Sequence, residues 1–285
     1  MKPLVSILIP TYNRPRYFEL ALKSALQQTY PNIEIVVCDN SDNNETELIV
    51  KRYQAEPNGS KILYVRNTKN IGPIANQQQC LRLASGEYVN YLMDDDLFHP
   101  DKIAKMIPYF LNNRGVTLVT SQRRVIDKDG KPLYVPPMWT FRKLYQTDTV
   151  VDGKVLNRLM MRDQTNYIGE PTTAMFRKKD LTEPFGVLMG RQVYYAVDLA
   201  AWVALLDKGK GVYMTKPLSY LRYHPKQLSQ HKMAGEVAKL DKETFLRFAK
   251  ARGYISEKEY DKYMKKISIP KGLREKVEDY LKKGR

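Results

Sequence analysis

The sequence predicts an α/β fold, a Rossmann-like, mostly parallel central sheet flanked by helices, with a helical C-terminal extension. Two observations lead to this prediction. In the first hundred residues, short apolar runs rich in β-branched residues alternate four times with amphipathic segments, as in strands joined by helical crossovers. From about residue 235 the chain has instead the spacing of basic, amphipathic helices. With 285 residues and 43% hydrophobic residues, it can bury a substantial core.

The first strand is expected at Val5–Pro10, where an apolar run ends in a proline and a polar turn. A helix follows, because Pro15 suits a first helical turn and apolar residues then recur on one face. Ile33–Cys38 has the composition of a second buried strand, and Glu45–Gln54 that of a second helix. The same alternation continues with a strand at 61–65, a helix at 70–84 and a strand at 88–93.

Because consecutive parallel strands need right-handed crossovers, this alternation places the carboxyl ends of the strands along one edge of the sheet. Ligands of such sheets bind outside that edge. Three polar segments follow predicted strands there: Thr11 to Asn13, Asp39 with Asn40, and Asp94 to Asp96. We therefore expect them to face one crevice.

After residue 115 the pattern changes. Val116–Ile126 is predicted as a longer strand, and Asp127 to Gly130 as a hairpin turn. Residues 135–148 lack periodicity and are predicted as a loop. The further predicted elements are a helix at 152–161, a strand at 172–176, an apolar helix at 198–206, and a helix opened by the capping box Ser256 to Glu259.

This organisation divides the chain into three parts. The first part is residues 1–98, the second 99–232, and the third, 233–285, is the basic helical extension. The extension can pack on the rest of the chain, form a homo-oligomer, or lie on an anionic membrane, and packing is the default expectation.

Composition limits the classes of partner. The net charge of +16 admits nucleic acid, anionic lipid and polyanionic substrates, but zinc-finger and RNP-type signatures are absent, so nucleic acid is not expected. No apolar run approaches the ~20 residues that span a bilayer, and the N-terminus does not have the pattern of a signal peptide. A cytoplasmic location is the default. Cys38 and Cys80 are read as buried thiols.

The acidic run Asp94–Asp96 is the strongest candidate site. Adjacent carboxylates repel one another unless a cation neutralises them, and Mg²⁺ and Mn²⁺ prefer oxygen ligands, often one or two carboxylates plus phosphate oxygens. The alternative is a solvated turn that caps the helix starting near Pro100. At the neighbouring strand ends, Tyr12 offers a ring that can stack on a base, and Asp39 a carboxylate that can accept a base N–H.

Four stretches of the chain resemble, in order, the motifs of family 2 glycosyltransferases: SILIPTYNRP, YPNIEIVVCDNSDNNET, RNTKNIGPIANQQQCLRLASGEYVNYLMDDDLFHPD and VDLAAWVALLDKG. The resemblance covers roughly residues 3–224. It implies that residues 1–98 are the nucleotide-sugar-binding half of the catalytic domain and residues 99–232 the acceptor-binding half. It implies a GT-A fold and an inverting transferase that uses a nucleotide-diphosphate sugar, here expected to be a UDP-sugar, and Mn²⁺ or Mg²⁺.

The resemblance also implies roles for individual residues. Asp95 matches the main metal ligand, Asp96 a further acidic position of the metal motif, and Asp198 the catalytic base. His224 is a candidate distal contact to the metal or diphosphate. The nucleotide-binding candidates are Pro10, Thr11, Tyr12, Arg14, Asp39, Gln77 and Asp94.

The chain departs from the family pattern at three places. Met93 stands where the family often has an aspartate, and Val197 where it has the glutamate of a Glu-Asp pair. Gln77 and Gln78 replace a common Arg-Asn pair, so another cation, such as Arg66 or His224, has to meet the diphosphate charge.

The chemistry of inversion needs a carboxylate that takes the acceptor proton and a cation that neutralises the leaving diphosphate. Asp198 and Asp95 are assigned these roles. The acceptor, a glycan or a lipid-linked sugar for a bacterial surface polysaccharide, is expected to contact Trp139 and Glu170. A peripheral membrane contact through the C-terminal helices stays open.

Two other functions fit parts of this pattern. A sugar-nucleotide pyrophosphorylase should carry a glycine-rich, arginine-containing loop after the first strand, and the turn Pro10 to Pro15 does not. A non-catalytic nucleotide- or glycan-binding module with a decayed site is the remaining alternative, favoured by Met93, Gln77 and Val197.

Overall fold

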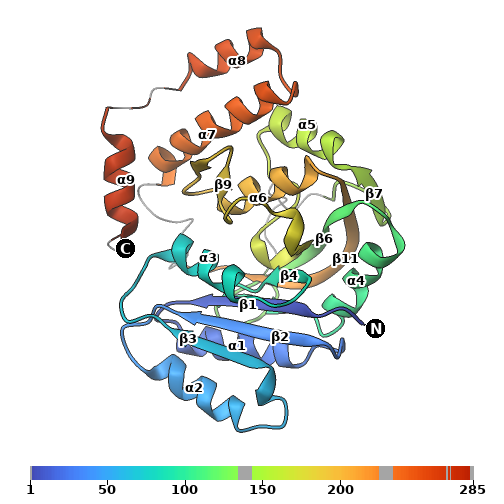
Figure 1. The fold of residues 1–285 in the computed structure, drawn as a ribbon, viewed down its shortest axis with the longest axis vertical. Helices are drawn as coiled ribbons and strands as arrows, with labels where there is room; N and C mark the ends of the chain where they lie inside the picture. Colours follow the sequence, from blue (N-terminus) through green and yellow to red (C-terminus); the bar gives the residue numbers. More distant parts are fainter. Residues whose placement is uncertain (1, 134–142, 225–233, 268, 270, 283–285) are drawn as a thin grey trace.

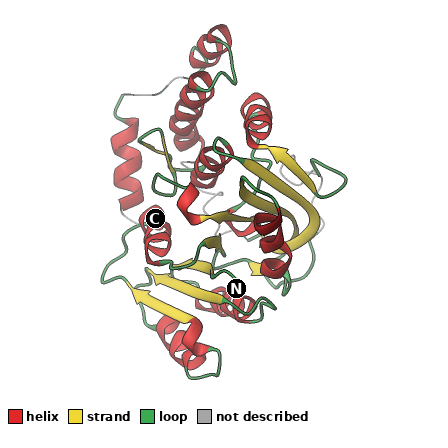
Figure 2. Ribbon diagram, turned by 45° about the vertical axis from the view of Figure 1, so that its right-hand side comes forward, coloured by secondary structure: helices red, strands yellow, loops and turns green. Residues whose placement is uncertain are grey.

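The computed structural model describes residues 2–133, 143–224, 234–267, 269 and 271–282. These residues form a nine-stranded sheet in the order β3-β2-β1-β4-β8-β6-β11-β5, with β7 paired to β11 beside this path. Helices cover both faces of the sheet (Figures 1 and 2). The predicted α/β architecture with a central sheet between helices is confirmed.

In the first half of the sheet all pairings between β1, β2, β3 and β4 are parallel, as predicted. Figure 1 shows α1 and α2 on one face of these strands and α3 on the other. The elements are β1 (Val5–Thr11), α1 (Pro15–Leu26), β2 (Ile33–Asp39), α2 (Glu45–Gln54), β3 (Ile62–Arg66), α3 (Pro73–Leu83) and β4 (Tyr88–Tyr91).

Alternation along β1 explains why this strand is apolar throughout. Ile7 and Ile9 point into the core on one face, which also contains residues of α1 and α4. Leu8 points into the core on the opposite face, together with Cys38 and Cys80. A strand between two cores needs apolar residues at every position. Both thiols are fully buried and free, as predicted.

The second half of the sheet is mixed. β6 and β11 are parallel, whereas β8 runs antiparallel to both β4 and β6. The predicted turn after β6 is present, with Gly130 at a φ of 86°. The elements are β5 (Leu97–Phe98), α4 (Lys102–Asn112), β6 (Val116–Ile126), β7 (Thr149–Asp152), α5 (Gly153–Asp163), β8 (Ala174–Arg177), β9 (Val187–Leu188), β10 (Arg191–Gln192), α6 (Val197–Leu206) and β11 (Lys210–Arg222).

Sequence patterning missed β7 and the thirteen-residue strand β11. β11 contains Lys216 and Pro217 in its interior, and its pairing with β6 shifts register on both sides of Pro217. A proline cannot donate a ladder hydrogen bond, so it argues against a central strand and is tolerated at such an irregularity. Of the predicted loop at 135–148, residues 143–148 contain neither helix nor strand.

The C-terminal extension folds as three helices, α7 (Ala234–Ala251), α8 (Glu257–Met264) and α9 (Leu273–Lys282). α7 packs against α5, and its Phe248 is buried in the core that contains α6. Asp241 accepts backbone N–H groups of Tyr194, Tyr195 and Ala196 at 2.7–2.9 Å. The capping box of Ser256 is present as predicted. Within the described ranges, no helix has the length and apolarity to cross a bilayer.

Candidate active site

The acidic run lies in the turn between β4 and β5, at the carboxyl edge of the parallel strands. Asp94 Oδ2 accepts a hydrogen bond from Thr11 Oγ1 at 3.0 Å and from the Tyr12 N–H at 3.3 Å. Thr11 is also in register with Asp39 across β1 and β2. The three strand ends therefore converge, as the parallel topology predicts.

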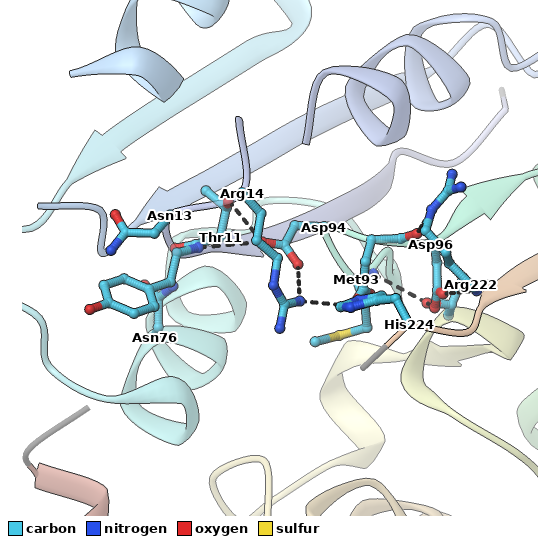
Figure 3. A network of polar contacts seen from close by, with 12 residues as sticks. Thr11, Asn13, Arg14, Asn76, Met93, Asp94, Asp96, Arg222 and His224 are labelled. Carbon is cyan, nitrogen blue, oxygen red and sulfur yellow. Dashed lines mark hydrogen bonds and ion pairs between the residues drawn. The ribbon is translucent and has the colours of Figure 1, made fainter. Parts of the chain in front are cut away.

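A chain of charged groups extends from this edge (Figure 3). Arg14, the residue before α1, donates through Nη1 to Asp94 Oδ1 at 2.9 Å and to Asp95 Oδ2 at 2.7 Å. His224 Nε2 lies 3.0 Å from the same Asp95 Oδ2. Burial raises the pKa of Asp94 to about 6, although the positive charge of Arg14 acts in the opposite direction. A guanidinium and an imidazole thus meet at the same oxygen of Asp95.

Asp96 has a different environment from its two neighbours. Its Oδ2 accepts from Thr172 Oγ1 at 2.6 Å, and its Oδ1 accepts from the Arg222 backbone N–H at 3.0 Å. It is 1% exposed, and burial, followed by the charge of Asp95, raises its pKa well above the ordinary range. Both oxygens are used within the fold, so the geometry favours a structural role; its predicted part in the metal site stays a prediction.

Arg222, at the end of β11, was not predicted from the sequence. Its Nε donates to the Asp95 carbonyl oxygen at 2.8 Å, and its guanidinium lies 4.8 Å from the centre of the Tyr17 ring. The same ring lies 5.2 Å from the His224 ring. Arg222 is 1% exposed and orders the acidic turn. A sequence reading that had identified β11 would have placed Arg222 and His224 together at a strand end.

The predicted nucleotide-binding residues divide into accessible and buried groups. Tyr12 is 36% exposed, and its hydroxyl donates to Asp42 Oδ2 at 3.0 Å. Asp39 is fully buried, with Oδ1 accepting from the Ser41 N–H and Oδ2 from the Tyr64 hydroxyl, each at 2.8 Å. Tyr12 offers a face for stacking, whereas Asp39 orders the loop beside it.

The two other predicted nucleotide contacts, Pro10 and Gln77, are both buried. Gln77 accepts the Tyr91 hydroxyl at its backbone oxygen, at 2.8 Å. Within the part of the chain that the structure describes, its side-chain oxygen is buried without a hydrogen-bond partner. Neither residue offers an open surface to a nucleotide in this conformation.

The predicted acceptor side is built by the loop before β8 and the first turn of α6. Asp198 and Trp202 are four residues apart and so share one face of α6. Asp198 Oδ2 accepts from Asn166 Nδ2 at 3.0 Å, and Trp202 Nε1 donates to the Gly169 carbonyl at 2.9 Å. Gly169 has a φ of 98°, which favours glycine at this turn.

Glu170 and Asp198 are the two carboxylates of this region. Glu170 pairs with Arg123 through two contacts of 3.1 Å. Burial is the main cause that raises the pKa of Asp96 and of Asp198, and the negative charge of Glu170 contributes to both. The loop that carries Glu170 contacts the acidic run through Thr172 and α6 through Asn166 and Gly169. Asp198 keeps part of its surface accessible, yet burial is the main cause that raises its pKa to about 7. Trp139, the other predicted acceptor contact, lies outside the described residues.

Asp95 and His224 are the residues that fit a divalent cation. Among the described side chains, no group of three or more His, Cys, Asp or Glu is arranged as a metal site. The carboxylate oxygen and ring nitrogen, 3.0 Å apart, match one edge of an octahedron with ~2.1 Å bonds. Carboxylates suit Mg²⁺ and Mn²⁺, and imidazole is a common metal ligand. These two groups would be the protein ligands of a divalent cation bound here, and oxygens of a bound diphosphate would be the others.

Comparison with known proteins gives a family match. A family model described as Glycosyl transferase family 2 matches residues 6–183. A putative teichuronic acid biosynthesis glycosyltransferase, TuaG of Bacillus subtilis, is 27% identical over 236 residues, 81% of this chain and 83% of its own length. An uncharacterized glycosyltransferase of Methanocaldococcus jannaschii is 33% identical over 147 residues, and the match covers 50% of each chain. The chain therefore matches about half the length of that relative.

Solved structures share the fold at low sequence identity. Staphylococcus aureus TarS 1-349 has a TM-score of 0.66 and 18% identity, covering 92% of this chain and 68% of its own. The same protein solved in complex with UDP-GlcNAc has a TM-score of 0.65 and 20% identity, covering 92% and 70%. The mannosyltransferase PcManGT of Pyrobaculum calidifontis, in complex with GDP-Man and Mn²⁺, has a TM-score of 0.58 and 18% identity, covering 87% and 64%.

Proposed function

The chain belongs to glycosyl transferase family 2, and from this premise we propose that it is an inverting, metal-dependent enzyme that uses a UDP-sugar. The acceptor is a hydroxyl of a glycan or lipid-linked sugar in the synthesis of a bacterial surface polysaccharide. The donor assignment is supported by the TarS complex with UDP-GlcNAc, and the pathway by the description of TuaG. The observation that carries the proposal is the convergence of Asp94, bound by Thr11 Oγ1 at 3.0 Å, with the ends of β1 and β2, at the edge where ligands of parallel sheets bind.

On the donor side, Tyr12 stacks on the base and Asp39 orders the adjoining loop. Asp95 and His224 would hold Mn²⁺ or Mg²⁺ together with diphosphate oxygens, and the bound cation would supply charge neutralisation to the leaving group. Arg14 lies next to the same position and adds a guanidinium. Asp94 keeps the acidic turn attached to β1 through Thr11.

On the acceptor side, Asp198 is the proposed general base. It takes the proton from the attacking hydroxyl as the new bond to the anomeric carbon forms and the bond to the diphosphate oxygen breaks. A single displacement of this kind inverts the anomeric configuration. Its pKa of about 7 is suited to proton transfer near neutral pH. Asn166 fixes its orientation, and Glu170, held by Arg123, is the proposed contact to acceptor or sugar hydroxyls.

The test is a panel of nucleotide sugars incubated with the protein and Mn²⁺, with release of the nucleoside diphosphate as the signal. We expect a UDP-sugar to give release that a chelator abolishes. NMR of the initial product gives the anomeric configuration of the transferred sugar, and retention of the donor's configuration would contradict the single displacement. Release that persists in chelator would contradict the metal dependence.

A further inference from the structure

Arg14 bridges two carboxylates of the acidic run, one of which is the proposed metal ligand Asp95. Its Nη1 is 2.9 Å from Asp94 Oδ1 and 2.7 Å from Asp95 Oδ2. The Asp95 oxygen is the same one that His224 contacts. In this structure the acidic turn is therefore neutralised by the chain's own guanidinium.

A metal ion and Arg14 cannot both use that oxygen in this arrangement. A divalent cation on Asp95 would stand beside the guanidinium, and like charges within a few ångströms repel strongly where solvent is scarce. The Arg14 side chain is 25% exposed, in contrast to 5% for Asp94 and 11% for Asp95. Arg14 is the longest and most exposed side chain of these three.

The donor offers Arg14 a second partner. A guanidinium pairs with phosphate oxygens in a geometry matched to its planar donors. Gln77 and Gln78 carry no charge, and Gln78 donates to the Phe185 carbonyl at 2.9 Å. The positive charge of Arg14, at the end of β1, can thus replace the arginine that the family often has on α3.

We propose that Arg14 is a resident counter-cation: it holds Asp95 in the donor-free enzyme, and yields it to the divalent cation as it pairs with the donor diphosphate. This inference rests on the proposed function, because it requires a metal and a nucleotide diphosphate at this edge. A bound diphosphate draws Arg14 away from Asp95 and so removes its competition with the metal. A bound metal likewise releases Arg14 to pair with the diphosphate. Their binding is therefore strongly and reciprocally coupled.

The experiment measures Mn²⁺ binding by electron paramagnetic resonance, with and without UDP, so that no catalytic turnover is needed. The variant is Arg14→Met, and Arg16→Met, an exposed arginine two residues later, is the matched control. Without UDP, we expect Arg14→Met to bind Mn²⁺ at least about tenfold more tightly than wild type, the effect of losing one charge-assisted competitor. The factor by which UDP tightens Mn²⁺ binding should fall by a similar amount, and the control should match wild type.

A second variant separates charge from folding. Arg14→Lys keeps the positive charge and should retain the weak donor-free Mn²⁺ binding of wild type. Equal Mn²⁺ affinity of wild type and Arg14→Met without UDP, or Arg14→Lys binding as tightly as Arg14→Met, would overturn the inference. Failure of wild type to bind Mn²⁺ even with UDP would instead contradict the proposed metal-dependent function.

Discussion

Replacement of Asp198 by asparagine gives the sharpest test of the proposed mechanism. The change removes the proton acceptor but keeps the size of the side chain and its ability to accept from Asn166. Loss of a general base slows turnover by roughly 10²- to 10⁴-fold. We expect UDP and Mn²⁺ to bind Asp198→Asn as they bind wild type, while UDP release with acceptor falls by at least two orders of magnitude.

The pH dependence follows from the sign of the pKa shift. Burial raises the pKa of Asp198 to about 7, from an unfolded value of ~3.9. The base is protonated below that pH, so the rate should fall about tenfold per unit as the pH drops below 7. The asparagine variant should not show this profile.

Stability should change in the opposite direction from activity. A raised folded-state pKa means that this group stabilises the fold fully below pH ~4 and loses that contribution as the pH rises to about 7. Between pH 5 and 7 the unfolded chain has an ionised Asp198 and the native protein does not. Each pH unit of this difference lowers the free energy of unfolding by about 1.36 kcal/mol, so the two units from pH 5 to 7 lower it by at most ~2.7 kcal/mol. Asp198→Asn should therefore gain up to that amount relative to wild type between pH 5 and 8.

Urea unfolding at pH 5 and pH 8 measures the stability change, and an assay of UDP release in the presence of acceptor measures activity. Asp152→Asn is the matched control, because Asp152 caps α5 by accepting the Lys154 N–H at 2.8 Å and is exposed. It should leave transfer unchanged. Transfer by Asp198→Asn within a few-fold of wild type would refute the assignment of the base, and Glu170 would become the next candidate.

Further predictions concern the other parts of the site. Tyr12→Ala should weaken UDP binding, measured by calorimetry, by roughly 1–3 kcal/mol if the base stacks there; unchanged affinity places the base elsewhere. Asp95→Asn should abolish metal-dependent turnover, and turnover equal to wild type would reduce the acidic run to a structural turn. Lys102→Met should gain stability relative to wild type as the pH falls from about 10 to 7, because burial lowers the pKa of Lys102 to about 7 and the folded state disfavours its charge. Charge reversal of Lys258 and Lys262 on α8 should reduce flotation with anionic liposomes at low salt if the extension contacts membrane, and equal flotation would leave packing as its role.

The sequence was sufficient to predict the donor side of the fold. Strands β1 to β4 are short apolar runs between turn residues, and their parallel order follows from the helices that connect them. Once the sheet is parallel, the meeting of Thr11 with Asp94 is a geometric consequence. This part of the site depends on local patterns and one topological rule.

The acceptor side could not be predicted to the same depth. β11 was missed because Pro217 and a register shift interrupt the pattern of a central strand. Without β11, nothing in the sequence indicated that Arg222 holds the Asp95 carbonyl. The pairing of Asp198 with Asn166 depends on a loop whose position is set by Trp202, a contact between segments more than thirty residues apart.

Three adjacent aspartates are compatible with one turn because the fold gives each a different partner. Asp94 is attached to β1 through Thr11, and Asp95 faces the Arg14 guanidinium and the His224 ring. Asp96 turns the other way. It binds Thr172, two residues after Glu170, and the backbone of Arg222, two residues before His224. A displacement of Asp96 would therefore move a proposed acceptor contact and a proposed metal ligand together. This buried carboxylate therefore ties the acidic turn to the loop before β8 and to the end of β11 at once.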